Sequence, residues 1–313
     1  MKIILGGLLL IWALGVSAQD YPNRPVRLLV GFAPGGGMDT IARIIAPKLA
    51  DSLGQPFLVE NRTGAGGALA ADALVRAAPD GYVLLLAESG TLIVPAMNPK
   101  AAYDPVKQFA AVGGVCALPL ALVSSTSFPA ANVQELISLL KASPGKYSYA
   151  SPGVGTLQHL AFELFMRAAG VQAVHVPYKG ATAMMPDLMS GQVPIGVVSA
   201  LAGVSQARGG KIRALAVTSA QRLPNAPEIP ALAETIAGFE AAPNVFLVAP
   251  AGFSSDKLSN AVRAAVTSPD VQESFSKQGA TPMPAQPAEL AARIAAETRR
   301  WSAVVKDAGI KAE

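Results

Sequence analysis

The sequence holds only two histidines, His159 and His175, the side chains best suited to acid–base or metal chemistry near neutral pH. No histidines, cysteines or carboxylates cluster at metal-ligand spacing, so no metal site is predicted. His175 lies in a strand-like run and is predicted to be a satisfied core residue. His159 lies in the first turn of a predicted helix. There it can either pair with Glu163 at i+4 or face a cleft, and the sequence leaves both open.

The sequence does not support an enzyme. An exported enzyme that uses His159 with a nearby hydroxyl would need a third residue to orient the imidazole, and none is apparent. The Gly-x-Ser-x-Gly elbow of α/β-hydrolases is also absent. We therefore predict no catalytic residue and no cofactor.

Anion capture by backbone and hydroxyl groups is the chemistry that remains, and Pro34-Gly35-Gly36-Gly37 is suited to it. An apolar run at 28–30 predicts a buried strand before this segment, and helical spacing predicts a helix after it. Met38 or Asp39 stands at the predicted N-cap, and Asp39 can also pair with Arg43 at i+4. Glycines let a ligand approach backbone N–H groups, and a helix N-terminus favours an anion. A tight turn without a ligand is the alternative, but three glycines after a proline exceed what a turn requires.

A second glycine-rich segment, Ser151-Pro-Gly-Val-Gly-Thr156, separates another predicted strand from a helix predicted over residues 157–169. An anion held by one such loop from each half of the chain would couple binding to closure. A dinucleotide fingerprint is not supported, because Thr40 stands where G-x-G-x-x-G needs its third glycine. The P-loop pattern fails as well, since Gly-Lys-Ser/Thr is absent.

The composition is that of a globular, exported protein. Hydrophobic residues make up 51% of the chain and charged residues 15%, which argues against disorder. Lys2 and the apolar run 3–14 precede Val16-Ser17-Ala18, so residues 1–18 are predicted to be a signal peptide cut after Ala18. The single cysteine, Cys116, has apolar neighbours and is predicted to be a buried, inert thiol. A net charge of +4 without basic runs gives no support for nucleic-acid binding.

Strand and helix patterns alternate along the chain after the signal segment, which predicts an α/β fold. Three βα-type units come first, and a second α/β set runs from residue 118 to residue 217. A strand at 245–249 is followed by two predicted helices, at 255–267 and 287–307. Ligands bind at the carboxyl ends of strands in such sheets, where both glycine loops would lie.

Several motifs together resemble the Bug-type substrate-binding proteins of tripartite tricarboxylate transporters. The resemblance covers residues 21–310. It is carried by Tyr21-Pro22-x-Arg24-Pro25-Val26-Arg27, Phe32-x-Pro34-Gly35-Gly36, Val59-Glu60-Asn61-Arg62-x-Gly64-Ala65-Gly66-Gly67, Ala78-Pro79-Asp80-Gly81-Tyr82, Tyr149-Ala150-Ser151-x-Gly153-x-Gly155-Thr156 and His175-Val176-Pro177-Tyr178-Lys179-Gly180.

The resemblance implies a type II periplasmic binding protein fold, with two α/β domains, two crossovers and a ligand cleft between the domains. It divides the chain into domain 1 (19–122 and 245–313) and domain 2 (123–244). It implies that loops of both domains grip a small organic carboxylate. The ligand-binding positions implied are Phe32, Pro34, Gly35, Gly36, Gly37, Asp39, Ser89, Gly90, Thr91, Ser151, Gly153, Gly155, Thr156, His159, Tyr178, Ala181, Ser199 and Phe246.

The chain departs from this family at positions that bear on the ligand. Many relatives carry an aspartate where Val198 stands, beside Ser199, and an acid there could receive an ammonium group. Its absence favours a plain carboxylate over an amino acid. Leu92, Leu157 and the pair Met184-Met185 hint at a more apolar pocket, although these residues can equally well repack a helix face.

The function implied is that of a monomeric periplasmic receptor that delivers a carboxylate to the membrane subunits of a tripartite tricarboxylate-type permease. The alternative is a carboxylate-sensing protein that acts with a signalling partner. No nucleic-acid partner is expected.

Overall fold

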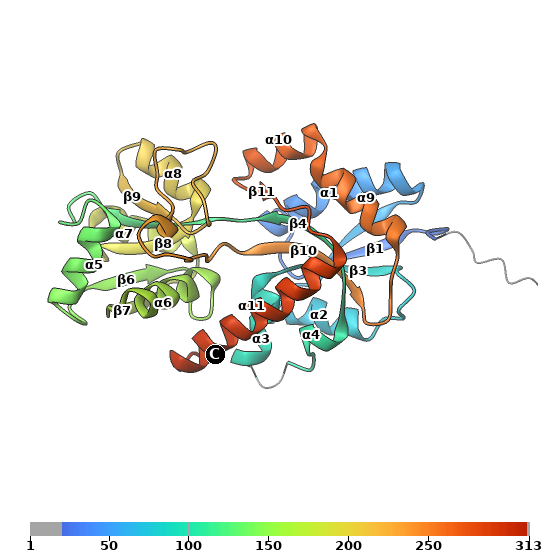
Figure 1. The fold of residues 1–313 in the computed structure, drawn as a ribbon, viewed down its shortest axis with the longest axis horizontal. Helices are drawn as coiled ribbons and strands as arrows, with labels where there is room; N and C mark the ends of the chain where they lie inside the picture. Colours follow the sequence, from blue (N-terminus) through green and yellow to red (C-terminus); the bar gives the residue numbers. More distant parts are fainter. Residues whose placement is uncertain (1–20, 99–100, 312–313) are drawn as a thin grey trace, which may run out of the picture.

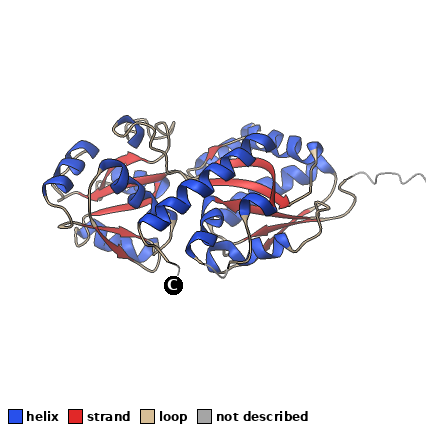
Figure 2. Ribbon diagram, turned by 60° about the horizontal axis from the view of Figure 1, so that its bottom comes forward, coloured by secondary structure: helices blue, strands red, loops and turns tan. Residues whose placement is uncertain are grey.

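Two β-sheets, each covered by helices, lie side by side in the computed structural model (Figure 1). The model describes residues 21–98 and 101–311. The predicted signal peptide and its cleavage site therefore lie outside the described residues. The strand order is β11-β4-β10-β3-β1-β2 in the first sheet and β7-β6-β8-β5-β9 in the second. Helices flank the strands of each sheet, as Figure 2 shows.

The first sheet combines parallel and antiparallel pairs. Strand β1 pairs in parallel with β2 and β3, whereas β10 returns from late in the chain and runs antiparallel to β3 and β4. Its elements are β1 (Val26–Val30), α1 (Gly37–Leu53), β2 (Phe57–Asn61), the 3₁₀ turn η1 (Ala65–Gly67), α2 (Ala68–Val75), β3 (Val83–Glu88), α3 (Ser89–Met97), α4 (Pro105–Gln108), β4 (Phe109–Ala117), β10 (Asn244–Pro250) and β11 (Thr281–Pro282).

Both faces of the first sheet are buried, because alternate residues of each strand point to opposite sides. Leu28 and Val30 of β1 pack with α1 and α9 (Asp256–Thr267), whereas Leu29 packs with α2 on the other face. Phe246 of β10 belongs to the α2 face and is fully buried there. Because both faces of the sheet are buried, successive residues of its strands are apolar, which explains the continuous apolar runs in the sequence.

The second sheet has β6 parallel to β7 and β8, with β5 antiparallel to β8 and β9. Its elements are β5 (Leu120–Ser125), α5 (Val133–Ala142), β6 (Ser148–Ser151), α6 (Leu157–Ala169), β7 (Val174–Pro177), α7 (Ala181–Ser190), β8 (Ile195–Ser199), α8 (Ala200–Arg208), β9 (Ile212–Val217) and the 3₁₀ turn η2 (Leu232–Glu234). The bounds predicted for α6 are confirmed: Thr156 caps its start through its side chain, and Gly170 ends it in the left-handed conformation.

Two crossing segments connect the sheets, and they lie side by side. The chain passes from β4 to β5 through Leu118 and Pro119, and it returns to β10 through Pro243. The Leu118 N–H donates a 2.7 Å hydrogen bond to the Pro243 carbonyl. Strand β5 begins at Leu120, so the division drawn between residues 122 and 123 falls inside a strand of the second sheet.

The C-terminal helix α11 (Pro287–Asp307) runs from the first sheet to the second (Figure 1). Leu290 and Ile294 pack in the core of the first sheet, whereas Trp301 and Val304 pack beside Phe162 of α6. The bounds predicted for α11 are confirmed. None of the helices within residues 21–98 and 101–311 is long and apolar enough to cross a membrane.

Two sequence-based expectations about helices were wrong. The segment after β10 holds three helices and not two, because α10 (Pro269–Lys277) follows α9 directly, with Pro269 at its first position. Helix α1 begins at Gly37 with Gly36 as its N-cap, so neither Met38 nor Asp39 is the cap. Glycine caps a helix without a side-chain hydrogen bond, and the sequence search for a polar cap overlooked it.

Candidate ligand-binding site

A cavity of about 880 Å³ is lined by loops of both sheets. Loops after β1 and β3 line it from the first sheet, the loop after β6 lines it from the second, and both crossing segments contribute. The volume lies within the range of small-molecule sites. The predicted ligand-binding residues that line this cavity are Phe32, Gly37, Gly90, Gly153, Gly155, Thr156 and Ser199.

The first glycine loop is held in shape from within the first domain. Gly35 has a φ of +77°, and its N–H donates to Asp39 Oδ2 at 2.9 Å. Gly36 N–H donates to the Ala33 carbonyl. Gly37 is the first residue of α1 and lines the cavity, and the N–H groups of the first helical turn have no acceptor inside the helix. The loop therefore presents the start of α1 to the cavity.

Asp39 supports this loop and is not itself among the cavity-lining residues. It is 2% exposed, and its carboxylate accepts from Arg43 Nε at 2.8 Å and from Asn61 Nδ2 at 2.9 Å. The predicted pair with Arg43 is confirmed. The hydrogen bond from Arg43 is the main reason that the pKa of Asp39 lies far below its usual range. Asp39 is therefore a permanent anion whose oxygens are already engaged.

The second glycine loop is held by the two histidines. Ser151 Oγ lies 2.7 Å from His175 Nε2, and Gly155 N–H donates to His159 Nδ1 at 3.1 Å. Thr156 Oγ1 donates to the Gly153 carbonyl at 2.8 Å. These bonds fix the backbone of residues 151–156 just before α6 begins.

Of the two positions left open for His159, the structure has the contact with Glu163 and not a place at the cavity. His159 is 5% exposed, and its Nε2 lies 3.6 Å from Glu163 Oε1. Its ring stacks on that of His175 with the centroids 3.8 Å apart. Neither histidine lines the cavity. His175 is half-buried and satisfied by Ser151, and burial, aided by His159, lowers its pKa to about 4.

The remaining predicted positions are not among the cavity-lining residues, for structural reasons. Ser89 is buried and bound to Glu297, Tyr178 donates to Asp187 at 2.7 Å, and Phe246 belongs to the core of the first sheet. Pro34, Gly35, Gly36 and Ala181 are exposed. Positions outside the cavity are Pro34, Gly35, Gly36, Asp39, Ser89, Thr91, Ser151, His159, Tyr178, Ala181 and Phe246.

Sequence reasoning missed several cavity-lining residues. Leu118, Pro119 and Pro243 belong to the crossing segments, whose position depends on both sheets. Glu88 is the last residue of β3, and its place at the carboxyl end of a strand was the signal that could have revealed it. Leu157 lines the cavity, as the departure from the family suggested, whereas Leu92 and Met184 lie in the cores.

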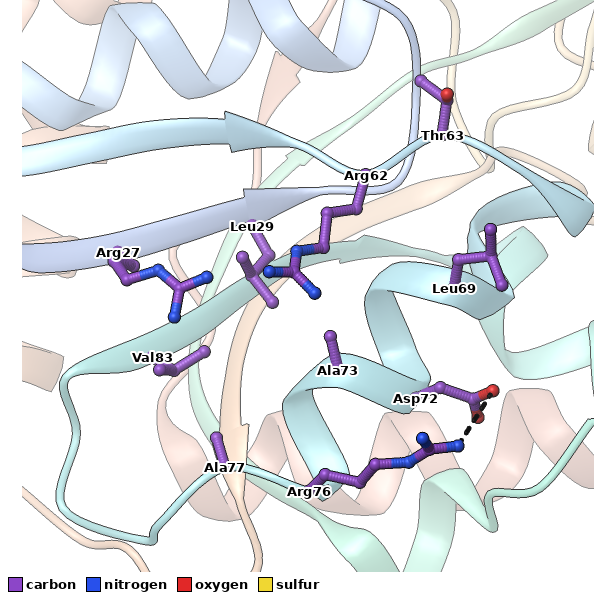
Figure 3. A pocket seen from close by; sticks show the side chains of 10 residues that line it. All are labelled: Arg27, Leu29, Arg62, Thr63, Leu69, Asp72, Ala73, Arg76, Ala77 and Val83. Atoms are coloured by element: carbon purple, nitrogen blue, oxygen red, sulfur yellow. Dashed lines mark ion pairs between the residues drawn. The ribbon is translucent and has the colours of Figure 1, made fainter.

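A second hollow, of about 680 Å³, lies beside strand β1, the segment that follows β2, and helix α2 (Figure 3). Arg27 of β1 and Arg62, which follows β2, point toward it, but both pair with Glu60, at 2.7 Å each. Arg76 lies 3.9 Å from Asp72. Since its arginines already have anionic partners in the chain, this hollow is a weaker anion site than the cavity between the sheets.

No group of three or more His, Cys, Asp or Glu within residues 21–98 and 101–311 is placed to hold a metal ion. Cys116 is buried in β4, and burial raises the pKa of its thiol far above the usual range. The predicted burial of this residue is confirmed. A protonated, enclosed thiol has little nucleophilic character.

Two α/β lobes joined by paired crossing segments, with a cavity between them, define a solute-binding protein of the periplasmic type. The family model described as "Tripartite tricarboxylate transporter family receptor" matches residues 41–310. The chain belongs to this family. The predicted family and fold class are thereby confirmed.

Relatives and solved structures agree with this assignment. Protein BugT of Bordetella pertussis is 37% identical over 302 residues, which cover 95% of this chain and 93% of BugT. The periplasmic binding protein BugD has a solved structure that is 33% identical, covers 94% of this chain and 100% of its own, and superposes with a TM-score of 0.74. The structure of R. palustris Rpa4515 with adipate is 33% identical, covers 93% of this chain and 99% of its own, and has a TM-score of 0.77.

Proposed function

We propose that the protein captures a small organic carboxylate in the cavity between the two sheets and delivers it to a tripartite tricarboxylate-type membrane permease. The observation that carries this proposal is the meeting of two helix starts at one cavity. Gly37 opens α1 from the first sheet, and Thr156 caps α6 from the second. The family assignment and the relative solved with adipate support the same ligand class.

The backbone N–H groups of the two helix starts donate the hydrogen bonds that hold the negatively charged carboxylate. No Lys, Arg or His is among the described residues that line the cavity. Each charge-assisted hydrogen bond contributes about 1.5–3 kcal/mol net, and a helix N-terminus adds ~0.3–1 kcal/mol. Four or five such contacts offset the entropy of binding and reach about −8 kcal/mol, which corresponds to micromolar affinity. An arginine is not required at this level of affinity.

A thermal-shift screen with mono-, di-, tri- and aromatic carboxylates tests the binding claim. A carboxylate that fills the cavity should stabilise the mature chain by about 2.7 kcal/mol at one hundred times its dissociation constant. Titration calorimetry then gives the affinity, and light scattering should report a monomer with and without ligand. If no carboxylate raises the melting temperature, the proposal fails.

The transport claim needs a cellular experiment. Deletion of the gene should abolish uptake of the carboxylate found in the screen, and the exported protein should begin at Gln19. Intact uptake with lost induction of carboxylate-responsive genes would assign the protein to sensing and would overturn the transport role.

A further inference from the structure

Glu88 carries the one charged side chain among the described residues that line the cavity. It ends β3 and stands at the N-cap of α3, but its carboxylate makes no capping hydrogen bond to that helix. No hydrogen bond or ion pair connects it to any other described residue. An acid in this position is unexpected in a site that recognises carboxylates, because two anions repel each other.

The Glu88 carboxylate has a defined place at the junction of the two lobes. A Cβ atom added to Gly90 would lie 2.6 Å from Glu88 Oε1 and 3.8 Å from the side chain of Leu157 in α6. Any residue other than glycine at position 90 would displace the carboxylate. Gly90 therefore leaves room for the carboxylate beside the backbone at the start of α3, and Leu157 of α6 lies near the same position.

No positively charged group of the part of the chain that the structure describes pairs with the Glu88 carboxylate. Glu88 is half-buried, and burial raises its pKa to about 7. Charged groups removed from water in proteins are normally paired, because an unpaired buried charge destabilises the fold. A ligand with a positive charge would supply the missing partner, whereas a plain dicarboxylate would leave Glu88 unpaired and add a second anion nearby.

We infer that the ligand carries a positively charged nitrogen that pairs with Glu88, in addition to the carboxylate held at the helix starts. The inference rests on the proposed function and names its substrate class: organic acids with an ammonium group. Glu88 would then do what the family resemblance implies for an aspartate at position 198, where this chain has the fully buried Val198. The expectation of a plain carboxylate is reversed on this view.

Matched pairs of ligands test the inference by calorimetry at pH 8. The pairs are adipate against 6-aminohexanoate, adipate against 2-aminoadipate, and benzoate against 4-(aminomethyl)benzoate. At least one aminated member should bind the wild-type protein tenfold or more tightly than its plain counterpart. Glu88→Gln should weaken that aminated ligand by tenfold or more and should leave the plain acid unchanged or bound more tightly.

Glu273→Gln is the matched control, because Glu273 is an exposed residue of α10 that pairs with Lys277. It should leave every affinity unchanged, and circular dichroism should show that both variants are folded. The inference is overturned if no aminated acid of the three pairs binds more tightly than its plain counterpart. It is also overturned if Glu88→Gln weakens both members of a pair equally. A different result would overturn the proposed function itself: no carboxylate of the wider thermal-shift screen would bind.

Discussion

The Ser89 hydroxyl donates a 2.6 Å hydrogen bond to Glu297 Oε2, although 208 residues separate the two in the chain. Ser89 begins α3, directly after Glu88, and Glu297 lies in the middle of α11. The Asn244 N–H donates to Ser89 Oγ at 2.9 Å, and the Asn244 side-chain amide donates to Glu297 Oε1. This buried network joins the start of α3, the start of β10 and the helix that spans both sheets.

Replacement of Glu297 should therefore destabilise the fold. Glu297 is 7% exposed, and Glu297→Ala would leave the Ser89 hydroxyl and the Asn244 amide buried without an acceptor. Each unsatisfied group costs about 1–3 kcal/mol, so we expect a loss of about 3 kcal/mol in the free energy of unfolding, measured with urea. Glu289→Ala on the same helix should change little, because Glu289 is exposed. Equal stabilities of the two variants would contradict the structural role of the network.

The ligand-free protein should gain stability from Glu88→Gln at high pH. The folded-state pKa of Glu88 is about 7, above its usual value of 4.5. The unfolded chain thus releases this proton first, and a penalty on the folded state develops as the pH rises from about 4.5 to 7. Glu88→Gln should be more stable than the wild type by about 1–3 kcal/mol at pH 8 and equal to it at pH 4. A thermal denaturation series in the absence of ligand checks this, and a constant difference at every pH would refute it.

His175 should contribute to acid sensitivity in the opposite direction. Burial is the main cause that lowers its pKa from 6.5 to about 4. The unfolded chain binds this proton at a higher pH, so stability is lost as the pH falls from about 6.5 toward 4. His175→Phe keeps a flat ring between Tyr149 and His159, where the imidazole now stacks. The melting temperature of His175→Phe should fall less steeply than that of the wild type between pH 7 and pH 4.5. If the two proteins lose melting temperature equally over this range, His175 does not contribute to acid sensitivity.

Gly155→Ala should impair ligand binding, and Gly170→Ala provides the control. Both glycines have positive φ, +74° and +64°, so both substitutions should cost a similar ~1–2 kcal/mol of stability. A Cβ at position 155 would lie 2.8 Å from Met97 Sδ at the cavity, whereas a Cβ at position 170 has no neighbour within 4 Å. Calorimetry should show tenfold or greater loss of carboxylate affinity for Gly155→Ala alone. Equal affinities for the two variants would exclude the second glycine loop from binding.

The sequence by itself determined many of the local elements and the family. Helix α6 was predicted between its true ends because Thr156 and Gly170 carry capping signals that act over a few residues. Strand β4 escaped detection because alanines and the pair Gly113-Gly114 replace the branched residues typical of strands. The tertiary structure explains Gly114, where a Cβ would lie 2.3 Å from the Met283 carbonyl.

Only the tertiary structure decided which polar side chains line the cavity between the sheets. Asp39, Ser89 and His159 have the chemistry of binding residues, but each is engaged by partners that hold the loops in place. Glu88 belongs to no binding motif, and only its place at the end of β3 marked it, yet it lines the cavity and has no hydrogen-bond or ion-pair partner among residues 21–98 and 101–311. Hydrophobic periodicity and capping signals act between residues a few positions apart. The satisfaction of a buried polar group, by contrast, depends on segments as distant as β3 and α11, which meet only after the whole chain has folded.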